Sequence, residues 1–468
     1  MTRIVIMGGG PAGYEAALVA AQYGASVTVI ERDGVGGACV LTDCVPSKTF
    51  IASAGGRTAV REAPSLGVML DADQVDVDVP VVHGRVNGLA LAQSVDVRAR
   101  LEADGIEIIE ATAVLADSTP GLASHVVAVQ TPDGTVSERT ADVVLIATGA
   151  CPRVLPDAVP DGERILTWRQ VYALTELPEH LVVVGSGVTG AEFASAYTEL
   201  GVPVTLVSSR DRVLPSEDAD AAAVIEEVFS SRGSVLVRQA RATSVVREGD
   251  GVLVTLQDGR VVRGSHALMT VGAVPNTVRI GLEAVGIDTD KGGFITVDRV
   301  SRTSVPGIYA AGDCTGVLML ASVAAMQGRI AMWHALGEGV PPLRLKTVSS
   351  TVFTHPEIAT VGYSQVEAEA ETTPAIVLMI PLATNARAKM MNLREGFVKL
   401  IVRPMTGIVI GGVVVAPSAA ELILPIAVAV QNRLTAKDLA YTFSVYPSLS
   451  GSITEVGRRL MHFSGDRG

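Results

Sequence analysis

The sequence predicts an α/β protein that contains two copies of one βαβ unit and a separate C-terminal segment. Two stretches repeat one another, "RIVIMGGGPAGYEAALVAAQYGASVTVIE" and "HLVVVGSGVTGAEFASAYTELGVPVTLVS". In each stretch an apolar strand leads into a glycine turn, an alanine-rich helix and a second strand. After the Pro341–Pro342 pair the composition changes to alternating strands and two late apolar helices. A proline pair cannot lie inside a helix or central strand, so we expect a domain boundary there.

The length, charge and apolar runs of the chain indicate which broad classes of protein it can belong to. A chain of 468 residues with 48% hydrophobic content can bury more than one core. The net charge of −12, with scattered lysines and arginines, indicates neither a nucleic-acid partner nor an anionic membrane surface. The first residues run directly into an apolar strand, and the apolar runs are shorter than the roughly 18 residues that a spanning helix needs. We therefore expect a cytoplasmic protein with small-molecule partners that is not embedded in a membrane.

Both βαβ units carry the pattern G-x-G-x-x-G immediately after the first strand. The glycines are Gly8, Gly10 and Gly13 in the first unit and Gly185, Gly187 and Gly190 in the second. The first glycine of such a pattern makes a tight turn, the second admits a pyrophosphate, and the third lets the helix pack closely on the strand. The phosphates then lie at a helix N-terminus. Two such motifs predict two dinucleotide sites.

The end of the second strand distinguishes the two nucleotides. Glu31 follows Gly13 by 18 residues, where a carboxylate accepts hydrogen bonds from ribose hydroxyls, and this favours FAD in the first unit. The second unit has Ser208 at that position, with Arg210 and Arg212 just beyond it. A missing carboxylate with nearby guanidiniums suits a 2′-phosphate, so the sequence favours NADPH over NADH.

A pair of cysteines indicates redox chemistry. Cys39 and Cys44 stand in "CVLTDC", and a close pair in a cytosolic chain is more often catalytic or metal-binding than structural. No second cysteine or histidine pair lies near them, so we expect no metal. If the pair opens a helix, the sulfurs lie on adjacent turns and the helix N-terminus stabilises a thiolate. The alternative is a pair of buried thiols that never cycle.

Taken together, the motifs resemble the flavoprotein (pyridine nucleotide) disulfide reductase family, which includes lipoamide dehydrogenase, glutathione reductase and mercuric reductase. The similar stretches run along the whole chain in family order: "GGGPAGYEAA", "GGACVLTDCVPSK", "ATGA", "GSGVTGAEFA", "VGAVPNT", "GIYAAGDCTG", "FTHPEIATVG" and "EGFVKLIV". The resemblance implies two Rossmann-like domains and a C-terminal α+β dimerisation domain that builds a homodimer. Its parts would be an FAD domain (1–150 and 272–342), an NAD(P) domain (151–271) and the interface domain (343–468).

The resemblance also implies the residues of the two nucleotide sites. For FAD they are Gly8, Gly10, Pro11, Ala12, Gly13, Glu31, Arg32, Gly37, Lys48, Thr148, Gly149, Gly312, Asp313 and Ala321. For the nicotinamide nucleotide they are Gly185, Gly187, Val188, Gly190, Glu192, Ser208, Arg210, Arg212 and Gly272. Asp313 would bind the flavin ribityl chain, and the alternative is a turn carboxylate that caps the following helix. Ala273 stands where many relatives have arginine.

The same resemblance assigns catalytic roles. Cys39 would be the thiol that exchanges with substrate, and Cys44 would be the thiol that faces the flavin. Lys48 and Glu192 would form an ion pair beside flavin N5, where a cation stabilises the charge of reduced flavin. The chain departs from the family at Asp43, which replaces a glycine and adds a negative charge that disfavours a thiolate if it points inward.

A second departure lies near the C-terminus. Family members that reduce disulfides carry H-P-x-x-x-E, but this chain reads Tyr446, Pro447, Ser448, Leu449, Ser450, Gly451. Tyrosine, with a reference pKa of about 10, is a poor proton shuttle at neutral pH, whereas histidine at about 6.5 is well matched. Quinone reduction needs no such dyad. We therefore expect an FAD-dependent NAD(P)H oxidoreductase that reduces a quinone, as in the quinone-reductase branch that resembles lipoamide dehydrogenase.

Alternatives remain at this point. The chain could be dihydrolipoamide dehydrogenase or another low-molecular-weight disulfide reductase that uses Cys39 and Cys44, with His355 or His462 as a replacement base. It could also be a catalytically idle flavoprotein subunit or NAD(P) sensor. Tyr446 either fills the space left by the dyad or contacts an aromatic acceptor.

Overall fold

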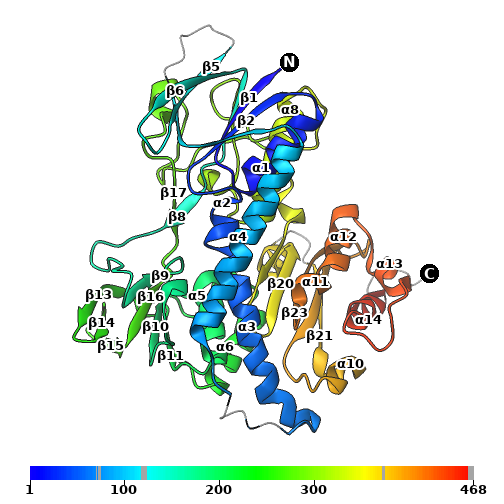
Figure 1. Ribbon diagram of the computed structural model, residues 1–468. Coiled ribbons are helices and arrows are strands. Elements are labelled where there is room, and N and C mark those ends of the chain that lie inside the picture. The colour runs from blue at the N-terminus through cyan, green and yellow to red at the C-terminus, as the bar shows by residue number, and fades with distance from the viewer. Residues whose placement is uncertain (70, 72–74, 117–123, 371–374, 462–468) are drawn as a thin grey trace. The chain divides into compact units, whose positions relative to one another are not determined.

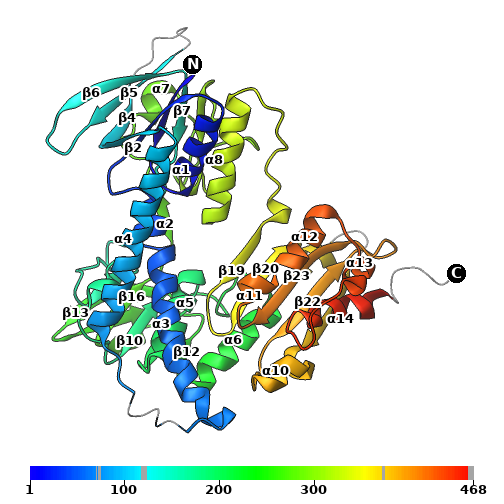
Figure 2. The same cartoon turned by 45° about the vertical axis from the view of Figure 1, so that its right-hand side comes forward.

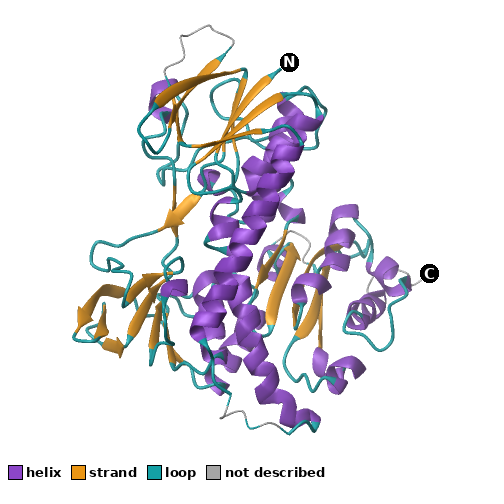
Figure 3. Cartoon of the chain, in the orientation of Figure 1, coloured by secondary structure: helices purple, strands orange, loops and turns teal. Residues whose placement is uncertain are grey.

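The computed structural model (Figure 1) describes residues 1–69, 71, 75–116, 124–370 and 375–461. The chain divides into two compact units. Unit 1 comprises residues 1–49, 81–153 and 272–343, and unit 2 comprises residues 50–80, 154–271 and 344–468. Figure 3 shows the alternation of strands and helices along the chain. Among the described residues, no helix is both long and apolar enough to cross a membrane.

Unit 1 is built on a parallel sheet in the order β18-β7-β1-β2-β3. Its strands are β1 (Arg3–Met7), β2 (Ser26–Glu31), β3 (Glu107–Glu110), β7 (Val143–Ile146) and β18 (Ile308–Ala310). Helices α1 (Pro11–Gln22) and α8 (Ala321–Ala335) pack against each other and share one apolar core with β1, β2 and β7. The first repeated stretch therefore forms the predicted βαβ unit.

Smaller elements complete unit 1. They are α2 (Gly37–Leu41), α7 (Leu282–Val285) and η4 (Asp313–Thr315), the antiparallel sheet β4 (Thr112–Leu115), β5 (His125–Gln130) and β6 (Val136–Ala141), and the antiparallel pair β8 (Ala150–Pro152) and β17 (Ala273–Pro275). Two long helices, α3 (Cys44–Glu62) and α4 (Val79–Ala103), have residues in both units.

In unit 2 the second repeated stretch forms a parallel sheet in the order β12-β11-β10-β16-β9. Its strands are β9 (Ile165–Thr167), β10 (Leu181–Val184), β11 (Val204–Val207), β12 (Val235–Val237) and β16 (His266–Met269). The helices of this part are α5 (Val188–Glu199) and α6 (Ala219–Ser231), and β13 (Ala242–Glu248), β14 (Gly251–Leu256) and β15 (Val261–Gly264) form an antiparallel sheet. The short helices η1 (Ala63–Leu66) and η3 (Val171–Ala173) also belong to unit 2.

The C-terminal part of unit 2 is an α+β layer, as the sequence predicts (Figure 2). Its antiparallel sheet has the order β19-β20-β23-β22-β21, formed by Ser349–Val352, Glu357–Gly362, Val409–Ala416, Phe397–Val402 and Ile376–Pro381. Its helices are α9 (Gln365–Glu369), α10 (Ala386–Met390), α11 (Ala419–Leu422), α12 (Leu424–Asn432), α13 (Ala436–Tyr441) and α14 (Gly451–Leu460), with short η5 (Leu345–Thr347) and η6 (Leu382–Thr384). Helices α11 and α12 pack on β20 and β23, whereas α14 packs on β21 and β22.

The contact between α1 and α8 predicts a sharp effect of one methyl group. A Cβ at Gly328 of α8 would lie 2.2 Å from the carbonyl oxygen of Ala12 in α1. We expect Gly328→Ala to destabilise the protein by about 1–3 kcal/mol because the two helices must separate. The measurement is the urea midpoint of unfolding.

The matched control is Gly88→Ala in the interior of α4, where an added Cβ meets nothing within 4 Å. Alanine is the better helix former, so this variant should be as stable as the wild type or more stable by about 0.5–1 kcal/mol. A Gly328→Ala protein with the wild-type midpoint would contradict the close packing of α1 on α8.

Candidate functional site

Two positions in the first glycine turn have no room for any residue other than glycine. Gly8 has φ +112°, and a Cβ there would lie 2.3 Å from the carbonyl oxygen of Ala147. A Cβ at Gly13 would lie 1.9 Å from the carbonyl oxygen of Gly8. Gly10 is the N-cap of α1, and a Cβ there would meet nothing closer than 4.0 Å. The turn thus leaves room at a helix N-terminus, where a pyrophosphate is stabilised.

Glu31 stands at the end of β2, beside this turn. Its Oε2 accepts a hydrogen bond from the backbone N–H of Gly9 (2.6 Å), and its Oε1 accepts one from the N–H of Asp33 (2.7 Å). The neighbouring Arg32 pairs with Asp33 (2.8 Å) on the surface. The carboxylate is therefore held next to the helix N-terminus, which is the position that ribose recognition requires.

Asp313 supplies a carboxyl group near the carboxyl end of β18. Burial, followed by the charge of Asp43, raises the pKa of Asp313 to about 6. Gly312 is the N-cap of η4 and no side chain caps that helix, so Asp313 does not play the alternative capping role. Among the described residues no side chain or backbone N–H donates to its carboxyl group. A half-buried carboxyl without such a donor suits the hydroxyls of a flavin ribityl chain.

The other predicted FAD residues lie around these groups in unit 1. Gly149 has φ +69° and open space where a Cβ would stand, whereas a Cβ at Gly37 would lie 2.8 Å from Cα of Gly10. Asn276 holds the Thr148–Gly149 turn: its Nδ2 donates to Thr148 O and its N–H donates to Gly149 O (both 2.9 Å). Pro11 and Ala12 lie in the first turn of α1, and Ala321 begins α8. These features fit FAD.

The two cysteines lie on different helices. Cys39 is in the short helix α2, and Cys44 is the first residue of α3. The two cysteines therefore do not share one continuous helix, because the helical structure is interrupted at Thr42 and Asp43. Both are free thiols. A hydrogen bond with Cys44 lowers the pKa of Cys39, whereas the same hydrogen bond, burial and the nearby Cys39 raise the pKa of Cys44. Of the reduced pair, Cys39 is therefore the sulfur that ionises first.

Two charged residues act on this pair with opposite signs. The carboxylate of Asp43 raises the pKa of both thiols, as the sequence suggests for an inward-pointing acid, and the ammonium of Lys48 lowers both. Lys48 lies four residues after Cys44 on α3, one helical turn away. Tyr14 of α1 is a neighbour that the sequence analysis missed: burial and then the charge of Cys39 raise the pKa of its phenol. Tyr14 lies in the stretch "GGGPAGYEAA", but that stretch gives it no role at the cysteines, because only folding brings it near the thiols.

Glu192 lies in α5 of unit 2 and is 3% exposed. Its Oε1 accepts a hydrogen bond from the backbone N–H of Phe353 (2.9 Å). One turn later, Ser195 Oγ accepts a hydrogen bond from the N–H of His355 (3.0 Å). The segment that contains "FTH" thus fixes the Glu192 carboxylate from its backbone.

The second glycine turn repeats the geometry of the first. Gly185 has φ +116°, and a Cβ there would lie 2.3 Å from the carbonyl oxygen of Thr270. A Cβ at Gly190 would lie 2.0 Å from Gly185 O. Gly187 is the N-cap of α5 and Val188 is its first residue. Gly272 follows β16 with φ +94°.

The end of β11 differs from the end of β2. Ser208 is 1% exposed, and its hydroxyl bonds the hydroxyl of Ser186 (2.7 Å) and accepts a hydrogen bond from Arg210 N–H (3.1 Å). Ser208 therefore supports the turn instead of facing a ribose. The Arg212 guanidinium donates to the carbonyl oxygens of Pro215 (3.0 Å) and Glu217 (3.1 Å), whereas Arg210 is exposed.

A polar hollow lies beside this turn. It has a volume of about 290 Å³ and is lined by Ser209, Gln239, Ala240, Arg241, Gln257 and Asp258. Backbone hydrogen bonds join its two sides, from Gln239 N–H to Arg210 O and from Ala240 N–H to Ser208 O (both 2.8 Å). The hollow thus follows the carboxyl ends of β11 and β12. Gln239 and Arg241 come just after β12, so their place behind a strand of the sheet is the signal in the sequence that points to this hollow.

Of the C-terminal frame, the first residue is exposed in the single chain and the other five are half-buried. Tyr446 is 85% exposed, and Gly451 begins α14. Among the candidate replacement bases, His355 is largely buried, and burial followed by the charge of Arg232 lowers its pKa, which favours the neutral imidazole. His462 lies outside the described residues. Among the described residues there is also no group of three or more His, Cys, Asp or Glu side chains that could hold a metal ion.

Comparison with protein families gives two matches that together cover most of the chain. Residues 2–328 match the family model described as pyridine nucleotide-disulphide oxidoreductase. Residues 348–456 match the model of the dimerisation domain of the same family.

Individual relatives align over nearly the full length. The chain is 65% identical to a Mycobacterium tuberculosis protein named NAD(P)H dehydrogenase (quinone), over 98% of this chain and 94% of the relative. It is 33% identical to a dihydrolipoyl dehydrogenase of Chlorobaculum tepidum, over 97% and 95% respectively. Among solved structures, LpdA from Mycobacterium tuberculosis has a TM-score of 0.95 at 64% identity, covering 98% of this chain and 100% of that one. The HOCl-induced flavoprotein disulfide reductase RclA from Escherichia coli has a TM-score of 0.85 at 25% identity, covering 98% and 99%.

The position of Asp43 predicts how the thiols titrate. Replacing Asp43 with Asn removes a negative charge that raises the pKa of Cys39, so more thiolate is present at a given pH below that pKa. We expect faster alkylation of Cys39 by iodoacetamide in the reduced protein and a midpoint of the pH–rate curve at lower pH. Mass spectrometry after brief labelling identifies the modified sulfur.

The control for this experiment is Asp104→Asn, which neutralises a carboxylate that bonds Arg100 at the end of α4. It should leave the alkylation curve unchanged. An unchanged or upward-shifted midpoint in Asp43→Asn would show that the Asp43 carboxylate does not act on the thiol pair.

Proposed function

Because this chain belongs to the pyridine nucleotide-disulphide oxidoreductase family, we propose that it oxidises NAD(P)H through FAD and passes the electrons to a quinone. The observation that carries the choice of acceptor is the C-terminal frame, in which Tyr446 and Gly451 stand where disulfide reductases of the family have histidine and glutamate. The relative from Mycobacterium tuberculosis that is named NAD(P)H dehydrogenase (quinone) supports the same acceptor.

The family, the α/β fold and the use of FAD and NAD(P)H, each predicted from the sequence, are confirmed by these matches. FAD, when bound, accepts a hydride from the nicotinamide and gives electrons to the acceptor. In the proposed arrangement the first glycine turn binds its pyrophosphate, and Glu31 and Asp313 bind its ribose and ribityl hydroxyls. We also propose that residues 1–150 and 272–342 form the FAD domain and that residues 151–271 form the NAD(P) domain.

Lys48 and Glu192 have complementary roles in this proposal. Lys48 supplies a positive charge near the thiols and, by family analogy, near flavin N5. Glu192 is buried and held by Phe353, so its carboxylate is oriented before any nucleotide binds.

The choice of a quinone follows from proton chemistry. Dithiol–disulfide exchange requires a base that titrates near neutral pH, and losing general acid–base catalysis typically costs about 10²–10⁴-fold in rate. Asp43 adds to this cost because it raises the pKa of both thiols. A quinone takes its protons largely from solvent or from reduced flavin, so neither obstacle applies. We propose that electrons pass from the flavin to the quinone directly.

Disulfide reduction is the second candidate, and one observation favours it. The Cys39 and Cys44 thiols share a hydrogen bond that lowers the pKa of Cys39, which is the ionisation an exchanging thiol needs. Relatives named dihydrolipoyl dehydrogenase align with the chain at about one third identity. This candidate requires a proton donor in place of the missing dyad.

We also propose a homodimer built through residues 343–468. The match to a dimerisation domain supports this assembly. A run of exposed large apolar side chains lies in the same part of the chain: Tyr441, Phe443, Val445 and Tyr446. Such a concentration is typical of a protein interface. A cytoplasmic location stays a prediction of the sequence.

We propose NADPH as the preferred reductant. The exposed Arg210 and the Arg241 of the polar hollow are placed at the carboxyl ends of β11 and β12, where an adenosine 2′-phosphate would lie. The absence of a carboxylate at Ser208 removes the charge that would repel that phosphate.

The acceptor is tested by steady-state oxidation of NADPH and NADH with a menadione-type quinone, lipoamide and glutathione disulfide. We expect fast turnover with the quinone and disulfide turnover slower by about 10²–10⁴-fold. Disulfide turnover at rates that rival the quinone would refute the proposal. Bleaching of FAD by NADPH without repeated turnover on any acceptor would identify an idle flavoprotein instead.

The matched control for the acceptor is Cys39→Ser, which removes disulfide chemistry. If electrons pass from flavin directly to the quinone, quinone turnover in this variant stays within about twofold of the wild type. A large loss of quinone turnover would show that electrons pass through the cysteine pair.

The nucleotide preference is tested by Arg210→Ala and Arg241→Ala, separately and together. Loss of a charged contact to the 2′-phosphate should raise the KM for NADPH by roughly 10-fold and leave the KM for NADH within about twofold. Arg263→Ala, which removes an exposed guanidinium paired with Glu248 in β13, is the control and should change neither value. Equal changes for the two nucleotides would exclude a 2′-phosphate contact.

A further inference from the structure

Lys399 is a buried cation to which neither the sequence motifs nor the proposed chemistry gives a role. It lies on β22, where every residue is buried, and its side chain is 1% exposed. Burying an ammonium group is costly unless it is paired and hydrogen-bonded. Its partners should therefore indicate why this charge is kept inside the protein.

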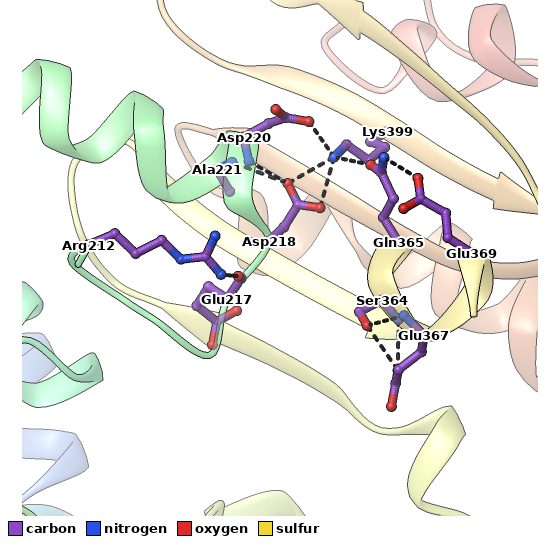
Figure 4. A network of polar contacts seen from close by, with 10 residues as sticks. All are labelled: Arg212, Glu217, Asp218, Asp220, Ala221, Ser364, Gln365, Glu367, Glu369 and Lys399. Atoms are coloured by element: carbon purple, nitrogen blue, oxygen red, sulfur yellow. Dashed lines mark hydrogen bonds and ion pairs between the residues drawn. The ribbon is translucent and has the colours of Figure 1, made fainter. Parts of the chain in front are cut away.

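The partners of Lys399 come from two separate stretches of unit 2 (Figure 4). Its Nζ bonds both carboxylate oxygens of Asp218 (2.9 and 2.8 Å) and Oδ2 of Asp220 (2.6 Å). It also donates to Oε1 of Gln365 in α9 (2.9 Å). The Asp218 side chain is 6% exposed, so this pair is removed from solvent, whereas the Asp220 side chain is 54% exposed.

Asp218 has a second structural role, at the start of α6. Its Oδ1 accepts hydrogen bonds from the backbone N–H groups of Asp220 (3.1 Å) and Ala221 (3.2 Å), so it is the N-cap of that helix. The same carboxylate that binds Lys399 therefore begins α6. An ion pair with Lys399 fixes the N-terminus of α6 to β22.

The segment just before α6 is residues 208–217, named here the 208–217 loop. Helix α6 holds this loop through Glu226, whose Oε1 accepts a hydrogen bond from Val213 N–H (2.8 Å). The loop also contacts the second glycine turn directly, because Leu214 N–H donates to the carbonyl oxygen of Ser186 (2.8 Å). The first contact joins the loop to α6, and the second joins the adjacent residue of the loop to the glycine turn.

Inside the loop, Arg212 connects the loop backbone to the residue that precedes Asp218. Its guanidinium donates to the carbonyl oxygens of Pro215 and Glu217, and Glu217 immediately precedes Asp218 (Figure 4). The loop is thus a folded segment with one end at Ser208 and the other at the buried ion pair. Its exposed residues include Ser209, which lines the polar hollow, and Arg210, which we propose to contact the nucleotide.

We propose that Lys399 is a positioning residue for the nicotinamide nucleotide: through its ion pair with the N-cap Asp218, it holds the 208–217 loop in the conformation that binds the adenosine end. This inference rests on the proposed function, because it takes NAD(P)H to bind at the second glycine turn. Lys399 touches neither the nucleotide nor the flavin. It acts on affinity for the nucleotide and leaves the hydride-transfer step unchanged.

The experiment compares FAD-loaded wild type with Lys399→Met, Asp218→Asn and the double variant. Calorimetry measures the Kd of NADP⁺ and NAD⁺, and stopped-flow absorbance measures the limiting rate of flavin reduction at saturating NADPH. We expect Lys399→Met to raise the Kd of NADP⁺ by roughly 3–30-fold and the limiting rate to stay within about twofold. FAD content should match the wild type.

Asp218→Asn isolates the charge, because Asn is as good an N-cap as Asp and α6 still begins at this residue. We expect it to raise the same Kd. If Lys399 acts through Asp218, the double variant weakens binding no more than the stronger single variant does. Independent, additive effects would overturn the proposal, and so would a wild-type Kd in Lys399→Met.

One control variant and one fallback variant make the result decisive. Lys346→Met breaks an exposed ion pair with Glu367 in the same part of the chain and should leave the Kd unchanged. If Lys399→Met does not fold, Asp218→Asn decides alone, and a wild-type Kd in that variant overturns the proposal. A wild-type protein that binds neither nucleotide refutes the proposed function itself. A wild type that binds and variants that bind equally well refute only the role of Lys399.

Discussion

The close approach of backbone to backbone at the two glycine turns is the constraint on which both proposed nucleotide sites depend. A Cβ at Gly13 or Gly190 would lie 1.9 or 2.0 Å from the carbonyl oxygen at the start of the same turn. No side chain fits at such distances, so strand, turn and helix can pack only with glycine there. The packing also places the N-terminus of α1 or α5 beside open space, and this is where an anion is stabilised.

The two glycine turns have the same geometry but differ in how they can recognise a nucleotide, because the residue at the end of the second strand differs. In unit 1, Glu31 is held against the turn by a backbone N–H and remains a carboxylate suited to a ribose. In unit 2, Ser208 is buried and bonded to Ser186, so in the proposed function the exposed part of the 208–217 loop takes over recognition of the nucleotide. The position of that loop then depends on α6, and the start of α6 depends on a lysine from the C-terminal sheet.

Electrostatics at the cysteine pair explains why a complete redox motif need not imply disulfide turnover. Lys48 favours thiolates and Asp43 opposes them, so the pair is weaker as an exchange centre than one with glycine at position 43. The missing histidine and glutamate act in the same direction, because they remove the group that would move protons. The proposed flavin route to a quinone avoids both limits, and under this proposal the two departures from the family are consistent with each other.

The sequence by itself determined the βαβ units, their glycine turns, the α+β segment and the family, because each depends on local periodicity or on a residue with no substitute. It also indicated that Asp43 would oppose the thiolates, since that effect follows from adjacency to Cys44. Only the tertiary structure decided that the helix is interrupted between Cys39 and Cys44 and that Ser208 is buried. It also decided that Gln239 and Arg241 line a hollow beside the second turn. Lys399 shows the reason most clearly: "GFVKLIV" predicts a buried strand, but the carboxylate that makes a buried lysine tolerable lies 181 residues away and is supplied by packing alone.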